Sequence, residues 1–392
     1  MVIATTKGLS RAHEIYTDRG LRVRELRKAG KKIVGYVCLY PPVEIISALG
    51  LVPFRVFGDM SEPITAADQV SITVVCPFLR SIIDLGLKGK FDFLDGIVGA
   101  HTCDIGMTLI ISWRDYVKDA PFTHLIDVPH TDHAPAVDYF EGQINSFKRH
   151  IEEFAGEKLT DDKLKKACEI HNKQRKLVRE LYDLRKSEPP LLTSTENLEV
   201  LMAISSLPVD EGNELLEDVI KEIKNRELKP PKKKARLLVW GPVVDNTSLY
   251  QLIENADANV VIDDTCVGTR AFWADVKAPY NLHALAQRYL VDIKCPRTYR
   301  DSCHQELERN YDKDLDSRFN YIKKAITDWK VNGAILQSVK YCDTHGYEVP
   351  NLRHYLDTLG IPSIYIEHDY SERSLAPIKT RVEAFVETLD LR

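Results

Sequence analysis

Two segments that lie far apart in the chain share one pattern. Near residue 95 the sequence reads LDGIVGAHTCD, and near residue 332 it reads VNGAILQSVKYCD. In both segments a predicted amphipathic helix leads through a small turn into a short apolar run typical of a buried strand, and a Cys-Asp pair follows. Ligands of open parallel α/β sheets bind at the carboxyl ends of strands. The pattern therefore predicts that Cys103 and Cys342 face one crevice between two halves of the chain.

The rest of the chain alternates short apolar runs with helical patterns, as mostly parallel sheets do. Strands are expected at 31–40, 51–58, 93–100, 123–129, 236–241, 259–264, 333–338 and 363–369. Between them the strand signal disappears and helical spacing predicts a bridge. We predict an α/β fold of two Rossmann-like (flavodoxin-like) parallel-sheet lobes, 31–136 and 230–392, joined by a helical segment at 137–229 and preceded by a helical lead-in at 1–30.

Composition limits the possible functions. A net charge of -5 over 392 residues argues against a nucleic-acid binder built on a basic surface. The basic stretch KPPKKKAR is interpreted as a charged linker between a helix and a strand. No apolar run approaches the roughly 18 residues that a membrane span needs, and the first residues do not have the pattern of a signal peptide. We expect a soluble, cytoplasmic protein.

The eight cysteines are too few for a disulfide scaffold, so in a reducing compartment we expect core residues, metal ligands or catalytic groups. Cys168, on a helical face, is interpreted as a core residue. Cys76 directly precedes a proline at the start of a predicted helix, where a thiolate is stabilised. No CxxC pair supports a zinc finger. Three cysteines spread along the chain instead suggest an iron-sulfur cluster held between the lobes.

Four longer segments together resemble the iron-sulfur subunits shared by benzoyl-CoA reductases and 2-hydroxyacyl-CoA dehydratases. They read PPVEIISALGLVPFRV, CPFLRSIIDLGLKGKFDFLDGIVGAHTCD, IDDTCVGTRAFW and LQSVKYCDTHGYEVPNLRHYLDTLGIPSIYIEHDYS. The resemblance runs from about residue 31 to the C-terminus. It implies a 4Fe-4S cluster on Cys76, Cys103 and Cys342, with one iron left open as a Lewis acid or electron donor.

The resemblance also implies the partners of such a subunit. These are an acyl-CoA substrate, a homologous iron-sulfur subunit in a hetero- or homodimer, and a separate ATP-hydrolysing 4Fe-4S activator. The sequence has no GxxxxGK[ST] phosphate loop, consistent with an ATPase on another chain.

The reaction is open between three branches. We expect the benzoyl-CoA reductase type, which dearomatises an aromatic acyl-CoA through radical intermediates; the alternative is an (R)-2-hydroxyacyl-CoA dehydratase. A third branch holds a double-cubane 8Fe-9S cluster, for which Cys266, Cys295 and Cys303 are candidate ligands, although packing under a turn and in a loop is the simpler explanation for them. A non-catalytic electron-relay subunit and a metal-free α/β binding protein are further alternatives.

Several polar residues are candidates for a direct role, each beside a simpler explanation. Glu44 is either a group near the thioester carbonyl or a negative charge that is favourable at the start of a helix. His101 and His130 are candidates for proton transfer, or they are hydrogen-bonded structural histidines. Arg270, beside Gly268, is a candidate for contact with CoA phosphates.

The aspartate after each cysteine of the repeated pattern has a simpler role. Asp104 and Asp343 are expected to cap the helices that begin there. We prefer capping to proton transfer for both.

Overall fold

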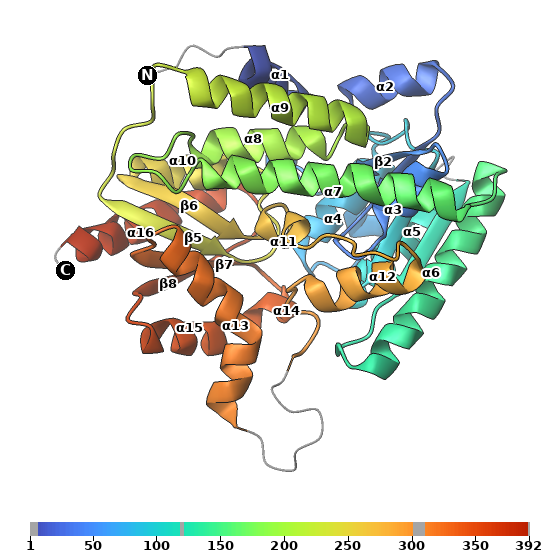
Figure 1. The fold of residues 1–392 in the computed structure, drawn as a ribbon. Coiled ribbons are helices and arrows are strands. Elements are labelled where there is room, and N and C mark those ends of the chain that lie inside the picture. Colours follow the sequence, from blue (N-terminus) through green and yellow to red (C-terminus); the bar gives the residue numbers. More distant parts are fainter. Residues whose placement is uncertain (1–6, 118–120, 301–309, 391–392) are drawn as a thin grey trace.

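The protein folds into two parallel-sheet lobes, seen side by side in a computed structural model that describes residues 7–117, 121–300 and 310–390 (Figure 1). Each lobe has four strands, all parallel, in the orders β2-β1-β3-β4 and β6-β5-β7-β8. The strands of the first lobe are β1 (Ile33–Tyr36), β2 (Val52–Arg55), β3 (Gly96–His101) and β4 (Phe122–Asp127). Those of the second are β5 (Ala235–Trp240), β6 (Ala258–Asp264), β7 (Gly333–Val339) and β8 (Ser363–His368). The predicted fold class and all eight predicted strands are confirmed.

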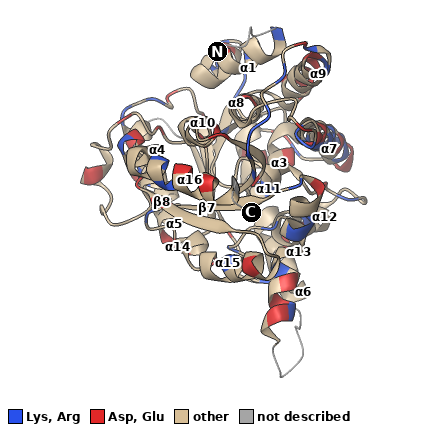
Figure 2. Ribbon diagram, turned by 90° about the vertical axis from the view of Figure 1, so that its left-hand side faces the viewer, with Lys and Arg blue, Asp and Glu red and all other residues tan. Residues whose placement is uncertain are grey.

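Helices cover both faces of the sheets, so the central strands β1, β3, β5 and β7 are buried along almost their whole length. In the first lobe these are α3 (Val43–Ala48), α4 (Pro77–Leu87) and α5 (Asp104–Tyr116). In the second they are α10 (Ser248–Asn255), α13 (Tyr311–Asp328), α15 (Val349–Thr358) and α16 (Leu375–Asp390). Lys, Arg, Asp and Glu gather on the helices, whereas the strands carry few of them (Figure 2).

Local sequence accounts for several element boundaries. α3 follows Pro42 and is closed by Gly50, whose φ of 70° is a left-handed conformation that favours glycine. Pro53 lies within β2, which is tolerated because β2 is an edge strand and needs no donor on its outer side. Such agreement between local signals and the fold explains why the strand and helix predictions succeed.

A helical layer spans the two lobes. It comprises α6 (Ala134–Ala155), α7 (Asp161–Asp183), α8 (Ser194–Ile204) and α9 (Val209–Asn225). Thr160 begins α7 by accepting a hydrogen bond from the Lys163 backbone amide, as its sequence suggests. The N-terminal helices α1 (Lys7–Thr17) and α2 (Leu21–Lys28) lie beside this layer, and α1 packs on α8 and α9 (Figure 1).

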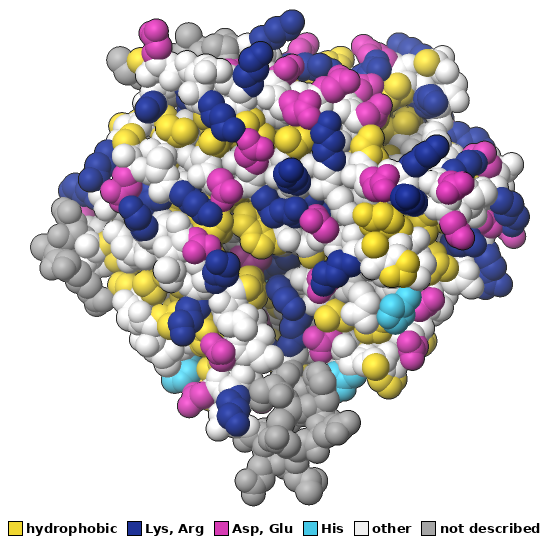
Figure 3. All heavy atoms as spheres, in the orientation of Figure 1, with side chains coloured by type: hydrophobic (Ala, Val, Ile, Leu, Met, Phe, Trp, Pro, Cys, Tyr) yellow, Lys and Arg dark blue, Asp and Glu magenta, His cyan; other side chains and the backbone are white. Residues whose placement is uncertain are grey.

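Shorter elements complete the fold. They are η1 (Ala67–Gln69), α11 (Thr269–Phe272), α12 (Leu282–Ala286), η2 (Gln287–Asp292), α14 (Asp343–Gly346) and η3 (Glu372–Ser374). Among the described residues, no helix combines the length and the apolar character needed to cross a bilayer. On the face shown in Figure 3, basic and acidic side chains are interspersed rather than separated.

Candidate functional site

The three cysteines predicted as ligands each occupy the position directly before a helix. Cys76 precedes α4, Cys103 precedes α5 and Cys342 precedes α14. The sulfur of each is close to backbone amides of the turn that follows, and these amides favour the thiolate: Phe78 and Leu79, Ile105 and Gly106, and His345, respectively. The same local arrangement, a cysteine directly before a helix with its sulfur near backbone amides, therefore occurs three times.

The sulfurs from the two lobes approach one another. Burial, with a smaller contribution from the nearby Cys103, raises the pKa of Cys76 to about 12. Burial also raises the pKa of Cys342 well above its ordinary value, and Cys76 and Cys103 both add to that rise. Without a cation between them the three groups stay neutral thiols, because burial and mutual repulsion outweigh the helix amides.

The aspartates that follow two of these cysteines do not cap in the way we expected. The capping positions are held by Cys103 and Cys342 themselves, and no side chain makes a capping hydrogen bond at either helix. Asp104 and Asp343 instead lie in the first turn, where a negative charge is favourable beside the helix N-terminus.

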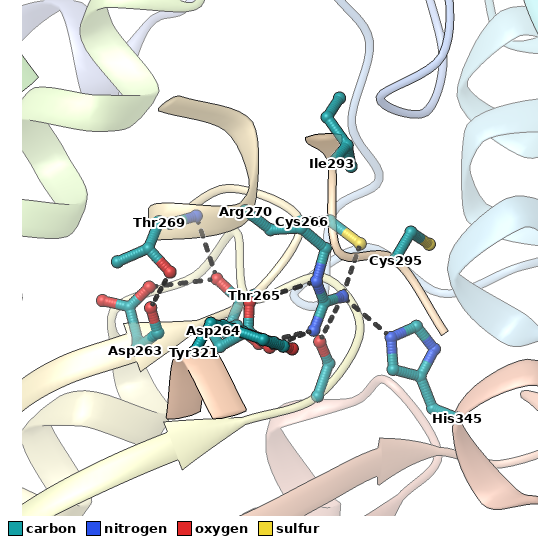
Figure 4. Close-up of polar contacts among 12 residues, drawn as sticks. Asp263, Asp264, Thr265, Cys266, Thr269, Arg270, Ile293, Cys295, Tyr321 and His345 are labelled. Atoms are coloured by element: carbon teal, nitrogen blue, oxygen red, sulfur yellow. Dashed lines mark hydrogen bonds and ion pairs between the residues drawn. The ribbon is translucent and has the colours of Figure 1, made fainter. Parts of the chain in front are cut away.

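A buried polar chain leads from Cys342 into the second lobe. Its members His345, Arg270 and Asp264 are shown in Figure 4. The Cys342 sulfur lies 3.4 Å from Nδ1 of His345, and Nε2 of His345 lies 3.0 Å from a guanidinium nitrogen of Arg270. Since arginine can only donate, Nε2 accepts and the proton of the neutral imidazole is on Nδ1, directed at the sulfur. Burial and Arg270 lower the pKa of His345 well below its usual value, so the ring stays neutral. His345 was not among the predicted residues, although it follows Cys342 by one helical turn.

Arg270, the predicted contact for CoA phosphates, already has protein partners. Its guanidinium donates to both carboxylate oxygens of Asp264, at 3.2 and 3.0 Å, and to the carbonyl oxygens of Gly241 and Asp264. The side chain is fully buried, and Tyr321 donates to the same carboxylate at 2.8 Å. The geometry favours a structural role, in which Arg270 orders the polar chain behind Cys342 and leaves no donor facing solvent.

Glu44 and His101, the predicted acid-base groups, lie in different surroundings. Glu44 is fully buried in the first turn of α3, where it is paired with Arg175 and accepts from Tyr289 at 2.7 Å. Burial favours its neutral form, but Arg175 and other nearby cationic groups outweigh burial and hold the pKa of Glu44 at about 2. His101 ends β3, two residues before Cys103, and is part-exposed, with Nδ1 2.9 Å from Asp127. Of the two, His101 is placed better for exchange with solvent.

His130 lies after β4, on the same edge as His101. Burial lowers its pKa, and Arg297 adds to this effect. Arg297 also donates to the backbone carbonyl oxygens of His101 and Thr102, so it fixes the loop that carries Cys103.

A second group of thiols adjoins the first, and sequence reasoning identified it only in part. Cys38, Cys266 and Cys295 influence one another: burial raises the pKa of Cys38 to about 12, and Cys266 and Cys295 add to the rise. Figure 4 shows Cys266 beside Cys295, with Arg270 contacting the Cys266 sulfur at 3.7 Å. Cys266 also contributes to the raised pKa of Cys342, which joins the two groups.

Cys38 is the member that was missed. It lies two residues after the end of β1, which is the same strand-to-cysteine signal, but no aspartate comes after it. Its φ of 76° is unusual for a residue with a side chain. Cys303, proposed for this group, lies outside the described residues. Cys168 is fully buried in the core with α6 and α7, in agreement with its interpretation as a core residue.

Comparison with known proteins identifies the family. Residues 38–389 match the family described as "2-hydroxyglutaryl-CoA dehydratase, D-component". The chain belongs to this family. It is 24% identical to the (R)-phenyllactyl-CoA dehydratase beta subunit of Clostridium sporogenes over 94% of both chains. It is 25% identical to a benzoyl-CoA reductase subunit of Thauera aromatica, over 99% of this chain and all of the relative. It is also 25% identical to the (R)-2-hydroxyglutaryl-CoA dehydratase beta subunit of Acidaminococcus fermentans, over 92% of this chain and 93% of the relative.

The similarity covers both lobes and the helical layer, and it includes both reaction types at nearly equal identity. The names of these relatives are those of enzyme subunits, so this chain is related to parts of larger enzymes. Identity of 24–25% does not separate a reductase from a dehydratase.

Proposed function

We propose that the protein is an iron-sulfur subunit of an enzyme that acts on a CoA thioester, with a 4Fe-4S cluster held by Cys76, Cys103 and Cys342. The observation that carries the proposal is the convergence of these three helix-capping thiols, from both lobes, on one buried site. Three protein ligands leave one iron open, and such a cluster supplies a Lewis acid and an electron donor.

The donor set fits a cluster better than a single metal ion. All seven cysteines in the described part of the chain are free thiols. A tetrahedral zinc with bonds of about 2.3 Å needs sulfur atoms about 3.8 Å apart. The three sulfurs do not all lie within 4.8 Å of one another; among the described residues the group of metal-type ligands that meets this limit is Asp138, Glu141 and His283, at the surface. A polynuclear cluster accommodates the wider spacing.

The chain's own residues have distinct tasks in this proposal. The helix amides and the Nδ1 proton of His345 stabilise negative charge on the sulfurs, and Arg270 holds His345 in the tautomer that does so. His101, kept in place by Asp127, is the candidate for moving a proton at the edge of the crevice. Glu44 is not proposed for this role, because its carboxylate is held in a buried ion pair with Arg175.

The reaction is proposed at the level that the relatives' names support. One names a benzoyl-CoA reductase and others name 2-hydroxyacyl-CoA dehydratases. We keep dearomatising reduction of an aromatic acyl-CoA as the first reaction to test and dehydration of a 2-hydroxyacyl-CoA as the alternative. A homologous second subunit and a separate ATP-hydrolysing activator complete the proposed enzyme.

Anaerobic purification followed by iron and sulfide analysis tests the cluster. The expected result is about four iron and four sulfide per chain; protein that binds neither contradicts the proposal. The complex, with activator and ATP, is then assayed against benzoyl-CoA and a panel of 2-hydroxyacyl-CoAs. Turnover of hydroxyacyl-CoAs alone assigns the dehydratase branch, and turnover of benzoyl-CoA alone assigns the reductase branch.

A second candidate, the double-cubane branch, is favoured by the second thiol group. Cys38, Cys266 and Cys295 are close enough to influence one another and lie next to the first group through Cys266 and Cys342. Arg270 opposes the rise in the pKa of Cys266, so positive charge is available to stabilise an anionic cluster. In this version Cys38 takes the place that the sequence assigned to Cys303.

Substitution in the second group distinguishes the two candidates. If it holds half of a double-cubane cluster, Cys38→Ala and Cys295→Ala each lower the bound iron by about half, because a thiolate ligand is lost. If the protein has a single 4Fe-4S cluster, both variants keep all their iron. Iron content is measured on anaerobically purified protein, with Cys168→Ala as the matched control for loss of a buried thiol.

A further inference from the structure

A cavity beneath the carboxyl ends of β1 and β2 contains a buried positive charge without a partner. Arg55, the last residue of β2, is 4% exposed. Its backbone amide bonds to Ser205, and its guanidinium stacks on Phe57, 5.1 Å from the ring centre. Within the described ranges, no carboxylate or other acceptor is bonded to the guanidinium, which lines the cavity. An unpaired buried charge is costly, so its retention points to a ligand.

A second donor lines the same cavity without an acceptor in the described part of the chain. Tyr36 is the register partner of Arg55 on the neighbouring strand, and no described residue is bonded to its hydroxyl. Gln174, on α7, also lines the cavity, but its Nε2 is shielded from it and lies against Gly212 of α9. A guanidinium and a hydroxyl thus come from two neighbouring strand ends to the same cavity.

The charge around the cavity is positive overall. Arg55, Arg175 and Arg288 line it, and no described aspartate or glutamate does. Arg175 is paired with Glu44, whereas Arg288 donates to the backbone carbonyl oxygens of Ala271 and Ala274. His171 adds no charge, because burial lowers its pKa to about 4. Two guanidinium charges therefore have no carboxylate bonded to them among the described residues.

Size and wall chemistry define the ligand further. The cavity volume is about 70 Å³, which corresponds to about five water-sized probes at roughly 14 Å³ each. Apolar side chains also line the cavity, among them Leu39, Val43, Ile204 and Leu207. A planar carboxylate matches the guanidinium fork in a bidentate pair, and a short alkyl group suits the apolar wall.

We propose that this cavity is a binding site for a small aliphatic carboxylate of acetate or propionate size, held by Arg55 and Tyr36. The cavity also reaches Cys38, so the bound anion lies beside the second thiol group. The inference does not rest on the cluster, because the residues proposed to hold the carboxylate, Arg55 and Tyr36, bind no iron in either candidate function.

Ligand-detected NMR on the whole chain tests the site, with acetate and propionate titrated at constant ionic strength and phosphate in a parallel titration. Saturable binding of propionate is expected. Arg55→Gln is expected to weaken it about tenfold or more, because a charge-assisted bidentate bond is lost. Arg353→Gln, at an exposed position on α15, is the control and is expected to bind as the wild type does.

Thermal unfolding separates a ligand site from a structural arginine. Without anion, Arg55→Gln is expected to raise the melting temperature, because it removes an unpaired buried charge; propionate is expected to raise the wild-type value only. Absence of propionate binding, equal binding by Arg55→Gln, or a melting temperature lowered by Arg55→Gln in the absence of anion would each overturn the proposal. Tighter binding of phosphate than of propionate would overturn the assignment to carboxylates. Iron content, measured on the same samples, reports separately on the proposed function.

Discussion

For a single cysteine, its position relative to a helix decides what its sulfur can do. Cys76, Cys103 and Cys342 precede helices and receive backbone amides, whereas Cys168 lies inside α7 among apolar side chains. Helix N-termini stabilise thiolates, and a fully apolar site penalises them. The three cysteines at helix starts therefore have backbone amides that can stabilise a metal-bound thiolate, whereas Cys168 lies in a helix interior.

The first prediction concerns these four cysteines. Replacement of Cys76, Cys103 or Cys342 by alanine is expected to lower bound iron and sulfide and to abolish activity, since alanine offers no ligand. Cys168→Ala removes a buried thiol of equal size and is expected to leave iron and activity intact. Metal analysis and the visible absorption spectrum of anaerobic protein provide the measurement. Full iron and an unchanged spectrum in Cys103→Ala would contradict the site.

Contacts between elements explain why Glu44 is buried and charged at once. It lies in the first turn of α3, and its partner Arg175 is on α7, so the ion pair ties the helical layer to the first lobe. Tyr289 from η2 donates to the same carboxylate. The pattern of apolar residues in PPVEIISALG predicts the helix, but it contains no information about a partner 131 positions away.

The second prediction follows from this pair. Glu44→Gln leaves Arg175 charged and buried, and the free energy of unfolding at pH 7 is expected to fall by about 3 kcal/mol or more. Because the folded-state pKa of about 2 is below the ordinary 4.5, the wild-type advantage is present above pH 4.5 and is lost as the pH falls toward 2. Urea denaturation measures the free energy of unfolding of both proteins at each pH. Glu25→Gln, in the exposed ion pair with Arg22, is the control. Unchanged stability with lost activity would instead support a catalytic Glu44.

For the whole molecule, one contact joins the lobes on the side of Cys76. Tyr370, after β8, packs its ring 5.4 Å from that of Phe78 on α4 and donates to Asp245 at 2.6 Å. A Cβ at Gly58 would lie 2.7 Å from the Tyr370 hydroxyl, so only glycine permits this approach. The carboxylate of Asp245 is thus buried where the two lobes meet.

The third prediction is a pH dependence at this contact. Burial raises the pKa of Asp245 from 3.8 to about 6, so the folded chain holds an additional proton between these values. The free energy of unfolding is therefore expected to fall as the pH rises from about 4 to 6 and to remain lower above that. The side chain of Asp245→Asn does not ionise, so the variant avoids this fall in the free energy of unfolding. Its side-chain oxygen still accepts the hydrogen bond of Tyr370. At pH 7 it is expected to stabilise the protein by up to about 3 kcal/mol.

Urea denaturation at pH 4 and pH 7 provides the measurement. The advantage of Asp245→Asn over the wild type is expected to be small at pH 4 and full at pH 7. Asp218→Asn, at an exposed position on α9, is the control. An equal effect of Asp245→Asn at both pH values would show that Asp245 has an ordinary pKa.

Local patterns in the chain were sufficient to predict the eight strands, the parallel sheets and the helical layer, because hydrophobic period, proline and glycine positions act within a few residues. They also placed Cys103 and Cys342 at strand ends, since both follow the same local pattern. Which side chains meet across the lobes became visible only in the folded molecule. Cys38 beside Cys266, His345 behind Cys342, and Arg55 without a partner all depend on contacts between segments far apart in sequence. Burial and pairing in three dimensions control the charge of such groups, and no local pattern specifies either.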